Sequence, residues 1–153
     1  MNLLELEGIN AALKQRSKKG EVYIQITNWE NYWKCYKIGM FDLCKRKKEH
    51  FLDCSRKAKY HVLVKKGFTE KILNGTNQRQ LSLATNIDTP TMCNSIMHKC
   101  FTLENLIIIC KVRKISINEL KENTEKIRVG NSTEIEDNEF IDFVLSRYIN
   151  FII

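Results

Sequence analysis

The spacing of apolar residues changes along the N-terminal part of the chain, and it predicts a helix followed by a strand. Apolar side chains recur every three or four positions in residues 2–16, which is typical of an amphipathic helix. Residues 21–27 alternate apolar and polar side chains, as a half-buried strand does. Its partner is either residues 31–38 or another copy of the chain, because a lone strand is unstable. Residues 31–38 also fit a helix, so both alternatives stay open.

Residues 41–66 predict a long basic helix. The segment contains neither glycine nor proline, and a sparse apolar stripe runs through it. Many of its other positions are lysine or arginine, whose side chains either face solvent or contact phosphates. Three nearby tyrosines either stack on nucleic-acid bases or belong to the core, and they are Tyr32, Tyr36 and Tyr60.

Residues 62–123 predict five short helices, because residues that start or stop helices separate short apolar runs. A left-handed cap at Asn74 would end the first helix, and Pro90 suits the first position of the third. Ser116 and Glu119 form a capping-box pattern before the fifth. The predicted helices are 62–73, 78–85, a third that is capped by Asp88 or Thr89, 102–112 and 116–123.

The C-terminal residues predict a loop and then an apolar helix. Residues 127–137 are polar and contain glycine, which indicates the loop. Residues 138–153 place apolar side chains on one wide helical face, in a segment too short and too charged to span a bilayer. That face packs against the N-terminal segment or forms a dimer interface. We therefore expect a mainly α fold with an α+β or helical N-terminal extension, in three regions: 1–60, 61–124 and 125–153.

Charge and cysteine usage narrow the class of protein. The chain has 153 residues, is 43% hydrophobic and carries a net charge of +7. Residues 34–66 hold eleven basic and three acidic side chains, a surplus that suits a polyanionic partner. The six cysteines form no Cys-x-x-Cys pair, so we expect reduced thiols and no zinc site. Neither a signal peptide nor a membrane-spanning run is apparent, which predicts a cytoplasmic protein without membrane contact.

The sequence gives little support to an enzyme. Its three histidines lack metal-binding spacing, and neither a glycine-rich phosphate loop nor a nucleophile elbow occurs. We therefore expect no catalytic residue, no metal and no cofactor.

Residues 78–96 carry a family resemblance. They read Gln-Arg-Gln-Leu-Ser-Leu-Ala-Thr-Asn-Ile-Asp-Thr-Pro-Thr-Met-Cys-Asn-Ser-Ile, which resembles the helix-turn-helix of the Cro/CI-type (XRE-like) repressors. Residues 102–111 and 115–120 are similar to the fourth and fifth helices of that family. The resemblance covers about residues 62–122, and it implies a five-helix DNA-binding domain whose third helix enters the major groove.

The resemblance also implies which residues contact DNA. Thr89, Thr91 and Asn94 would read base edges from the start of the third helix. Gln78 would brace against the phosphate backbone and the recognition helix. Lys99 would contact a phosphate just after that helix.

Several positions depart from the family pattern. Asn86 stands where the family usually has glycine in the turn, and asparagine tolerates the left-handed conformation. Asp88 either repels phosphates or caps the third helix. Arg113 and Lys114 replace the usual leucine and glycine, so the fourth helix is expected to end differently or to lose core packing. The recognition helix contains no lysine or arginine, which also fits a domain that has lost DNA binding.

These features predict a sequence-specific transcriptional regulator, such as a repressor, that binds double-stranded DNA as a homodimer. Isoleucine, lysine and asparagine make up about a third of the chain, as in AT-rich phage or mobile-element genes. The alternative is a small phage inhibitor similar to anti-CRISPR proteins. It would bind a host protein or nucleoprotein complex through its N-terminal region and use the helix-turn-helix for autoregulation or as a scaffold. The predicted basic patch consists of Lys45, Arg46, Lys47, Lys48, Arg56, Lys57 and Lys59.

Overall fold

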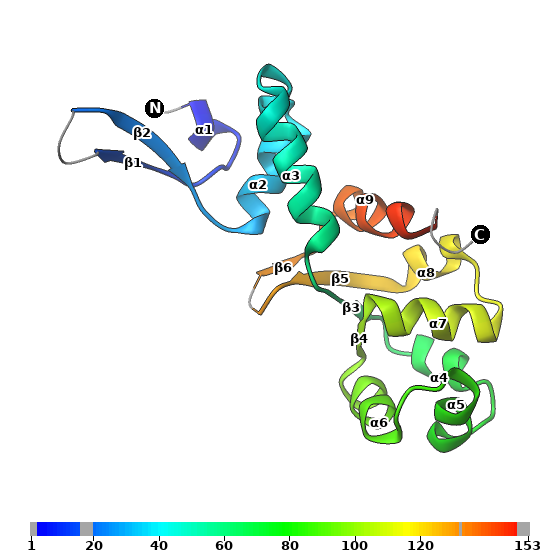
Figure 1. Ribbon diagram of the computed structural model, residues 1–153. Helices are drawn as coiled ribbons and strands as arrows, with labels where there is room; N and C mark the ends of the chain where they lie inside the picture. The colour runs from blue at the N-terminus through cyan, green and yellow to red at the C-terminus, as the bar shows by residue number, and fades with distance from the viewer. Residues whose placement is uncertain (1–2, 16–19, 132, 150–153) are drawn as a thin grey trace. The chain divides into compact units, whose positions relative to one another are not determined.

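The computed structural model describes residues 3–15, 20–131 and 133–149 (Figure 1). The chain divides into two compact units, residues 1–58 and residues 59–153. We describe each unit by itself and call them unit 1 and unit 2.

Unit 1 begins with one helical turn and a two-stranded antiparallel hairpin. These elements are α1 (Leu3–Leu6), β1 (Ala11–Gln15) and β2 (Val22–Ile26). A strand is confirmed within residues 21–27, but four of its five side chains are exposed rather than half-buried, and its partner is β1 rather than residues 31–38 or another copy. The helix predicted over 2–16 is wrong beyond its first turn. Gly8 takes a left-handed φ of 64°, which ends the helix, and the following residues pair with β2.

The rest of unit 1 is helical, so the helix alternative for residues 31–38 is the correct one. Its elements are α2 (Trp29–Lys37), a short 3-10 helix η1 (Met40–Leu43) and α3 (Lys45–Lys57). The Asn28 side chain caps α2 by accepting from the Asn31 backbone N–H at 2.9 Å. The buried Asn31 amide donates to the Thr27 carbonyl at 2.8 Å and to the Asn10 carbonyl at 3.3 Å. It thereby ties the hairpin to α2.

The single helix predicted over 41–66 is wrong at both ends. Cys44 is extended before α3 begins, and Ala58 is extended after it ends. The following residues form a strand in unit 2, because the β-branched pair Val62 and Val64 suits an extended chain with one buried face.

Unit 2 contains a four-stranded antiparallel sheet, which makes the fold α+β. Its strand order is β4-β3-β5-β6. The mainly α, five-helix domain is therefore a wrong prediction for this chain. The first half of the helix predicted over 62–73 is a strand, and so is much of the loop predicted over 127–137. The strands are β3 (Tyr60–Val64), β4 (Cys100–Thr102), β5 (Thr124–Val129) and β6 (Thr133–Ile135).

The later predicted helices of unit 2 are confirmed close to their expected limits. The 62–73 segment keeps a helix in its second half, after Gly67. The C-terminal helix predicted over 138–153 is present as far as Ile149, and residues 150–153 lie outside the described residues. These helices are α4 (Phe68–Leu73), α5 (Gln78–Thr85), α6 (Thr89–His98), α7 (Leu103–Arg113), α8 (Ile117–Asn123) and α9 (Asn138–Ile149).

The core of unit 2 joins the sheet to the helices. Its fully buried side chains include Phe68, Leu81, Phe101, Leu106 and Ile127. Helix α9 contacts β5 and α8, and Figure 1 shows it beside these elements. We expected the apolar face of α9 to pack against the N-terminal segment or a second copy. Its buried side chains include Phe140, Ile141, Val144 and Leu145, and the helix contacts β5 and α8 of its own unit.

None of the helices in the described residues is both long enough and apolar enough to cross a membrane.

Candidate nucleic-acid interface

Helices α5 and α6 are joined by a tight turn, and we call them the α5–α6 pair. Asn86 ends α5 in the left-handed conformation, with a φ of 56°, as its place in the turn requires. The buried Ser82 hydroxyl donates to the Ile87 carbonyl and lies 3.1 Å from the Thr89 hydroxyl. A small side chain at position 82 lets the two helices approach, and its hydroxyl fixes the turn between them.

A capping box of two reciprocal hydrogen bonds closes the start of α5. The Asn77 side chain accepts from the Gln80 backbone N–H at 2.9 Å, and the Gln80 side chain accepts from the Asn77 N–H at 3.2 Å. Gln78 and Arg79 follow the cap. Together with Thr89, among others, they line an open hollow of about 440 Å³ between the starts of α5 and α6. The structure therefore brings the predicted residues Gln78 and Thr89 to one place.

Asp88 is the cap of α6. Its carboxylate accepts from the Thr91 backbone N–H at 3.0 Å. Hydrogen bonds from the Thr91 backbone and side chain hold the pKa of the Asp88 carboxyl below its ordinary value. Of the two roles expected for Asp88, the structure has the capping one. Its charge still lies exposed at the start of α6.

The three predicted base readers differ in how free their polar groups are. The Thr89 hydroxyl faces Ser82, so its methyl group is the part left for a base contact. The half-buried Thr91 side chain bonds to Asp88. Asn94 is exposed, and its amide has no hydrogen-bond partner among the described residues. Asn94 is therefore the predicted base reader whose donor and acceptor groups both face solvent unpaired.

Lys99 lies at the other end of α6. It ends that helix in the left-handed conformation, with a φ of 53°, and its carbonyl accepts from the Val64 N–H at 2.9 Å. The half-buried side chain is separated from Thr89 by the length of α6, about 15 Å at 1.5 Å per residue. The structure does not bring Lys99 to the hollow at the start of the helix.

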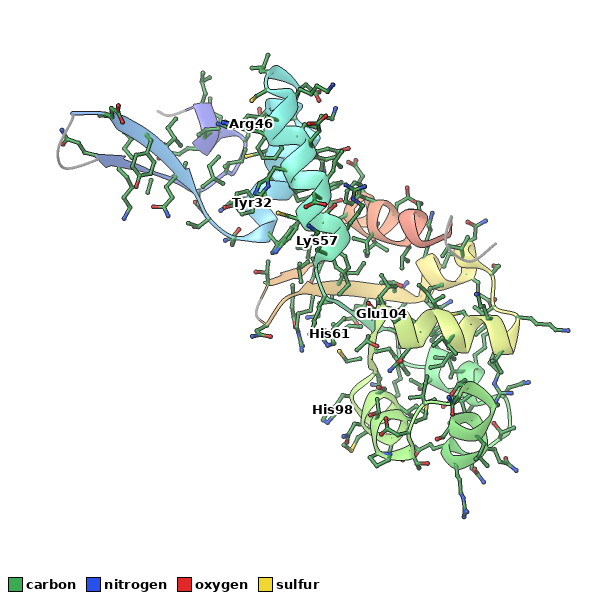
Figure 2. The ribbon with its side chains drawn as sticks, viewed as in Figure 1. Tyr32, Arg46, Lys57, His61, His98 and Glu104 are labelled. Atoms are coloured by element: carbon green, nitrogen blue, oxygen red, sulfur yellow. The ribbon has the colours of Figure 1, made fainter. Side chains whose placement is uncertain are left out.

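The exposed side chains of the α5–α6 pair that were not predicted as contacts include Arg79, Met97 and His98. Arg79 lies in the first turn of α5, Met97 is 65% exposed on α6, and His98 is exposed at the end of that helix (Figure 2). Arg79 could have been found from the sequence, because Asn77 as a cap places it in the first turn. Met97 gives no such signal, since an apolar residue at that spacing is usually buried.

Arg113 and Lys114 close α7 without the residues usual in the resembling family. Lys114 adopts the left-handed conformation expected of glycine there, with a φ of 55°. The Arg113 guanidinium donates to the Ile72 carbonyl at 2.7 Å, the Leu73 carbonyl at 3.0 Å and the Thr76 hydroxyl at 2.6 Å. These hydrogen bonds compensate for the expected loss of packing, because they tie α7 to the end of α4 and to the residues that follow it.

The predicted basic patch lies mostly on α3 of unit 1, and carboxylates pair with most of it. Lys45 lies 3.8 Å from Glu49, and Lys48 pairs with Asp42. Arg56 and Lys57 share Asp53, at 3.5 Å and 2.8 Å.

Three cations of the patch remain, and they are Arg46 and Lys47 on α3 and Lys59. Arg46 and Lys47 have no carboxylate partner within the described part of the chain. Lys59 is the patch residue that belongs to unit 2.

The three tyrosines considered as stacking residues differ in how far their rings are exposed. Tyr60 is 3% exposed and packs against Phe140, so it belongs to the core. Tyr36 is half-buried and stacks on Trp33 and Phe51. Tyr32 is 38% exposed and is available at the surface of unit 1.

Comparisons of the chain with protein-family models, with curated proteins and with solved structures find no match. The resemblance to Cro/CI-type repressors therefore stays a prediction.

Proposed function

We propose that the α5–α6 pair reads the major groove of double-stranded DNA and that the protein is a sequence-specific transcriptional regulator. The observation that carries this proposal is the exposed, unpaired amide of Asn94 on α6. An asparagine amide can form two hydrogen bonds with the edge of an adenine. The capped start of α6 and its tight turn support the proposal, because a base reader needs a helix with a fixed direction.

Groups around Asn94 supply phosphate contacts in this proposal. Arg79 is exposed in the first turn of α5, where the helix dipole also favours an anion. Lys99 follows the end of α6. These are few cations, so a single α5–α6 pair binds weakly. We therefore include a homodimer in the proposal, since two half-sites read together multiply a weak affinity.

The test selects sequences from a random duplex library with the full chain and then measures their affinity. We expect one enriched motif, arranged as an inverted repeat if the protein is a dimer. Asn94→Ala should weaken binding to that motif by about 1–3 kcal/mol, or roughly 5- to 150-fold. Affinity for a shuffled duplex should stay unchanged, because phosphate contacts carry no sequence information.

Asn118→Ala is the matched control, because Asn118 is also exposed near the start of a helix, α8. It should bind the motif as the unaltered protein does. Failure to enrich any motif would contradict the proposal, and so would equal effects of the Asn94 and Asn118 substitutions.

A further inference from the structure

Unit 1 contains a groove that the proposed function does not use. It has a volume of about 730 Å³ and lies between β2 and the helices α2, η1 and α3. Four successive residues of β2, Tyr23 to Ile26, form one side. On α3 the lining runs from Arg46 to Cys54, about 12 Å along the helix axis at 1.5 Å per residue. Figure 2 marks Tyr32 on α2 and Arg46 on α3, two of its lining residues.

Aromatic rings with exposed area line the groove. Tyr23 is 46% exposed and Tyr32 is 38% exposed. Trp29 is half-buried and held from two sides: its ring centroid lies 6.4 Å from Tyr32 in an edge-on contact and 6.0 Å from the buried Phe51. A ring held in this way offers a flat surface at a small further cost in side-chain entropy. Such rings are suited to stacking against planar groups.

Cations line the same groove as these rings. Arg46 and Lys47 both line the groove, and they are the two α3 members of the basic patch without a carboxylate partner among the described residues. His50, one turn further along α3, adds a third basic group. No aspartate or glutamate is among the described residues that line the groove. The groove is thus electropositive, whereas the other α3 cations of the patch are each paired with a carboxylate, Arg56 and Lys57 sharing that of Asp53.

We propose that this groove binds a single-stranded nucleic acid, with bases stacked on Trp29, Tyr32 and Tyr23 and phosphates paired with Arg46 and Lys47. Exposed rings together with cations are the combination that single-stranded binding surfaces use. A duplex keeps its base faces inside the stack, so exposed rings would gain little from it. An acidic peptide would use the cations and leave the rings uncovered. The lengthwise lining along β2 and α3 suits a polynucleotide rather than one free nucleotide.

The experiment measures fluorescence anisotropy of labelled 12-mer single-stranded DNA and RNA with the full chain. Binding should weaken as salt rises, because phosphate contacts release counterions. It should also quench the tryptophan emission, since both tryptophans, Trp29 and Trp33, lie in unit 1. Tyr32→Ala should lower the affinity roughly 5- to 100-fold, the loss expected for one stacked base. Arg46→Ala should lower both the affinity and the steepness of the salt dependence.

Lys45→Ala is the matched control, because it removes the same charge from the neighbouring position outside the groove. It should change binding far less than Arg46→Ala, and its side chain is exposed enough that both variants should fold alike. Asn94→Ala should not affect single-strand binding, which separates this site from the α5–α6 pair.

Several results would overturn the inference. Equally tight binding of the matching duplex would do so, and so would equally tight binding of polyglutamate with the same response to Arg46→Ala. Complete displacement of the labelled 12-mer by an equimolar free mononucleotide would show that the groove binds a nucleotide rather than a polynucleotide. Equal losses of affinity in the Lys45 and Arg46 variants would show that the groove is not the binding site.

Discussion

Units 1 and 2 are built from similar kinds of residues, yet they bury them to very different degrees. Among the described residues, the buried apolar side chains of unit 1 are Ile9, Trp33, Cys35 and Phe51, while those of unit 2 form a continuous core around its sheet. Unit 1 instead exposes large apolar side chains, such as Leu13, Val22 and Ile24 on its hairpin. A surface of this kind is typical of a region whose partner is another molecule.

The two units also differ in what their polar groups do. In unit 2 the bonds of Arg113 and Ser82 fix one element against another, and α6 is left with Asn94 facing outward. In unit 1 Arg46 and Lys47, which lack a carboxylate partner among the described residues, line one groove together with exposed rings. The difference teaches that net charge alone does not locate a binding surface, because pairing with carboxylates decides which cations remain available.

The largest expected effect tests whether the units unfold separately. Phe101→Ala empties a fully buried position of unit 2 and should lower its free energy of unfolding by about 3–5 kcal/mol. Urea unfolding followed by far-UV circular dichroism should show this loss. Tryptophan fluorescence, which reports unit 1, should keep its midpoint.

Leu83→Ala is the control for that experiment, since Leu83 is 77% exposed on α5 and should contribute little. If the fluorescence and dichroism midpoints moved together in Phe101→Ala, the two units would be one cooperative structure and the comparison would fail.

A smaller effect is expected from Arg113→Ala. The substitution removes three hydrogen bonds that join α7 to the end of α4 and should destabilise unit 2 by about 2–3 kcal/mol. Lys111→Ala, in the same last turn of α7 but exposed, should leave the midpoint of unit 2 nearly unchanged. An equal, small effect of both substitutions would show that Arg113 does not hold these helices together.

The smallest effect concerns the charge that caps α6. Because the folded-state pKa of Asp88 is lowered, its stabilising contribution is present above the unfolded pKa of about 3.8 and is lost as the pH falls through the folded value. Asp88→Asn keeps a capping side chain and removes the titration. The stability of unit 2 should therefore fall less steeply below pH 4 in Asp88→Asn than in the unaltered protein. The same pH dependence of stability below pH 4 in the two proteins would contradict this role of Asp88.

Local signals in the sequence predicted α5, α6, α7 and α8 well, because their caps act within three residues. Asn77, Thr102 and Ser116 each bind the N–H three positions ahead. The sheet was missed because its partners are distant: Val62 pairs with Ile127 and with Phe101. No periodicity within one segment shows such a pairing, and a short strand of alternating burial was taken for the start of a helix.

The candidate sites were predictable to a similar extent. Gln78 and Thr89 begin their helices and Asn94 lies in the middle of α6, so their helices and caps followed from the sequence. The groove of unit 1 was not foreseen, since it depends on which cations find carboxylates and on how β2 lies beside α3. The sequence showed the basic helix and the nearby tyrosines, and it left open whether those rings stack or pack.

The buried Asn31 amide has a consequence for the order in which unit 1 folds. It bonds to Asn10, which lies 21 positions earlier, and its own backbone is held by the cap of α2. Closing that contact early would cost more chain entropy than forming one helical turn. We therefore expect α2 to form first and the hairpin to reach its final register afterwards, so that the helices of unit 1 fold before its strands.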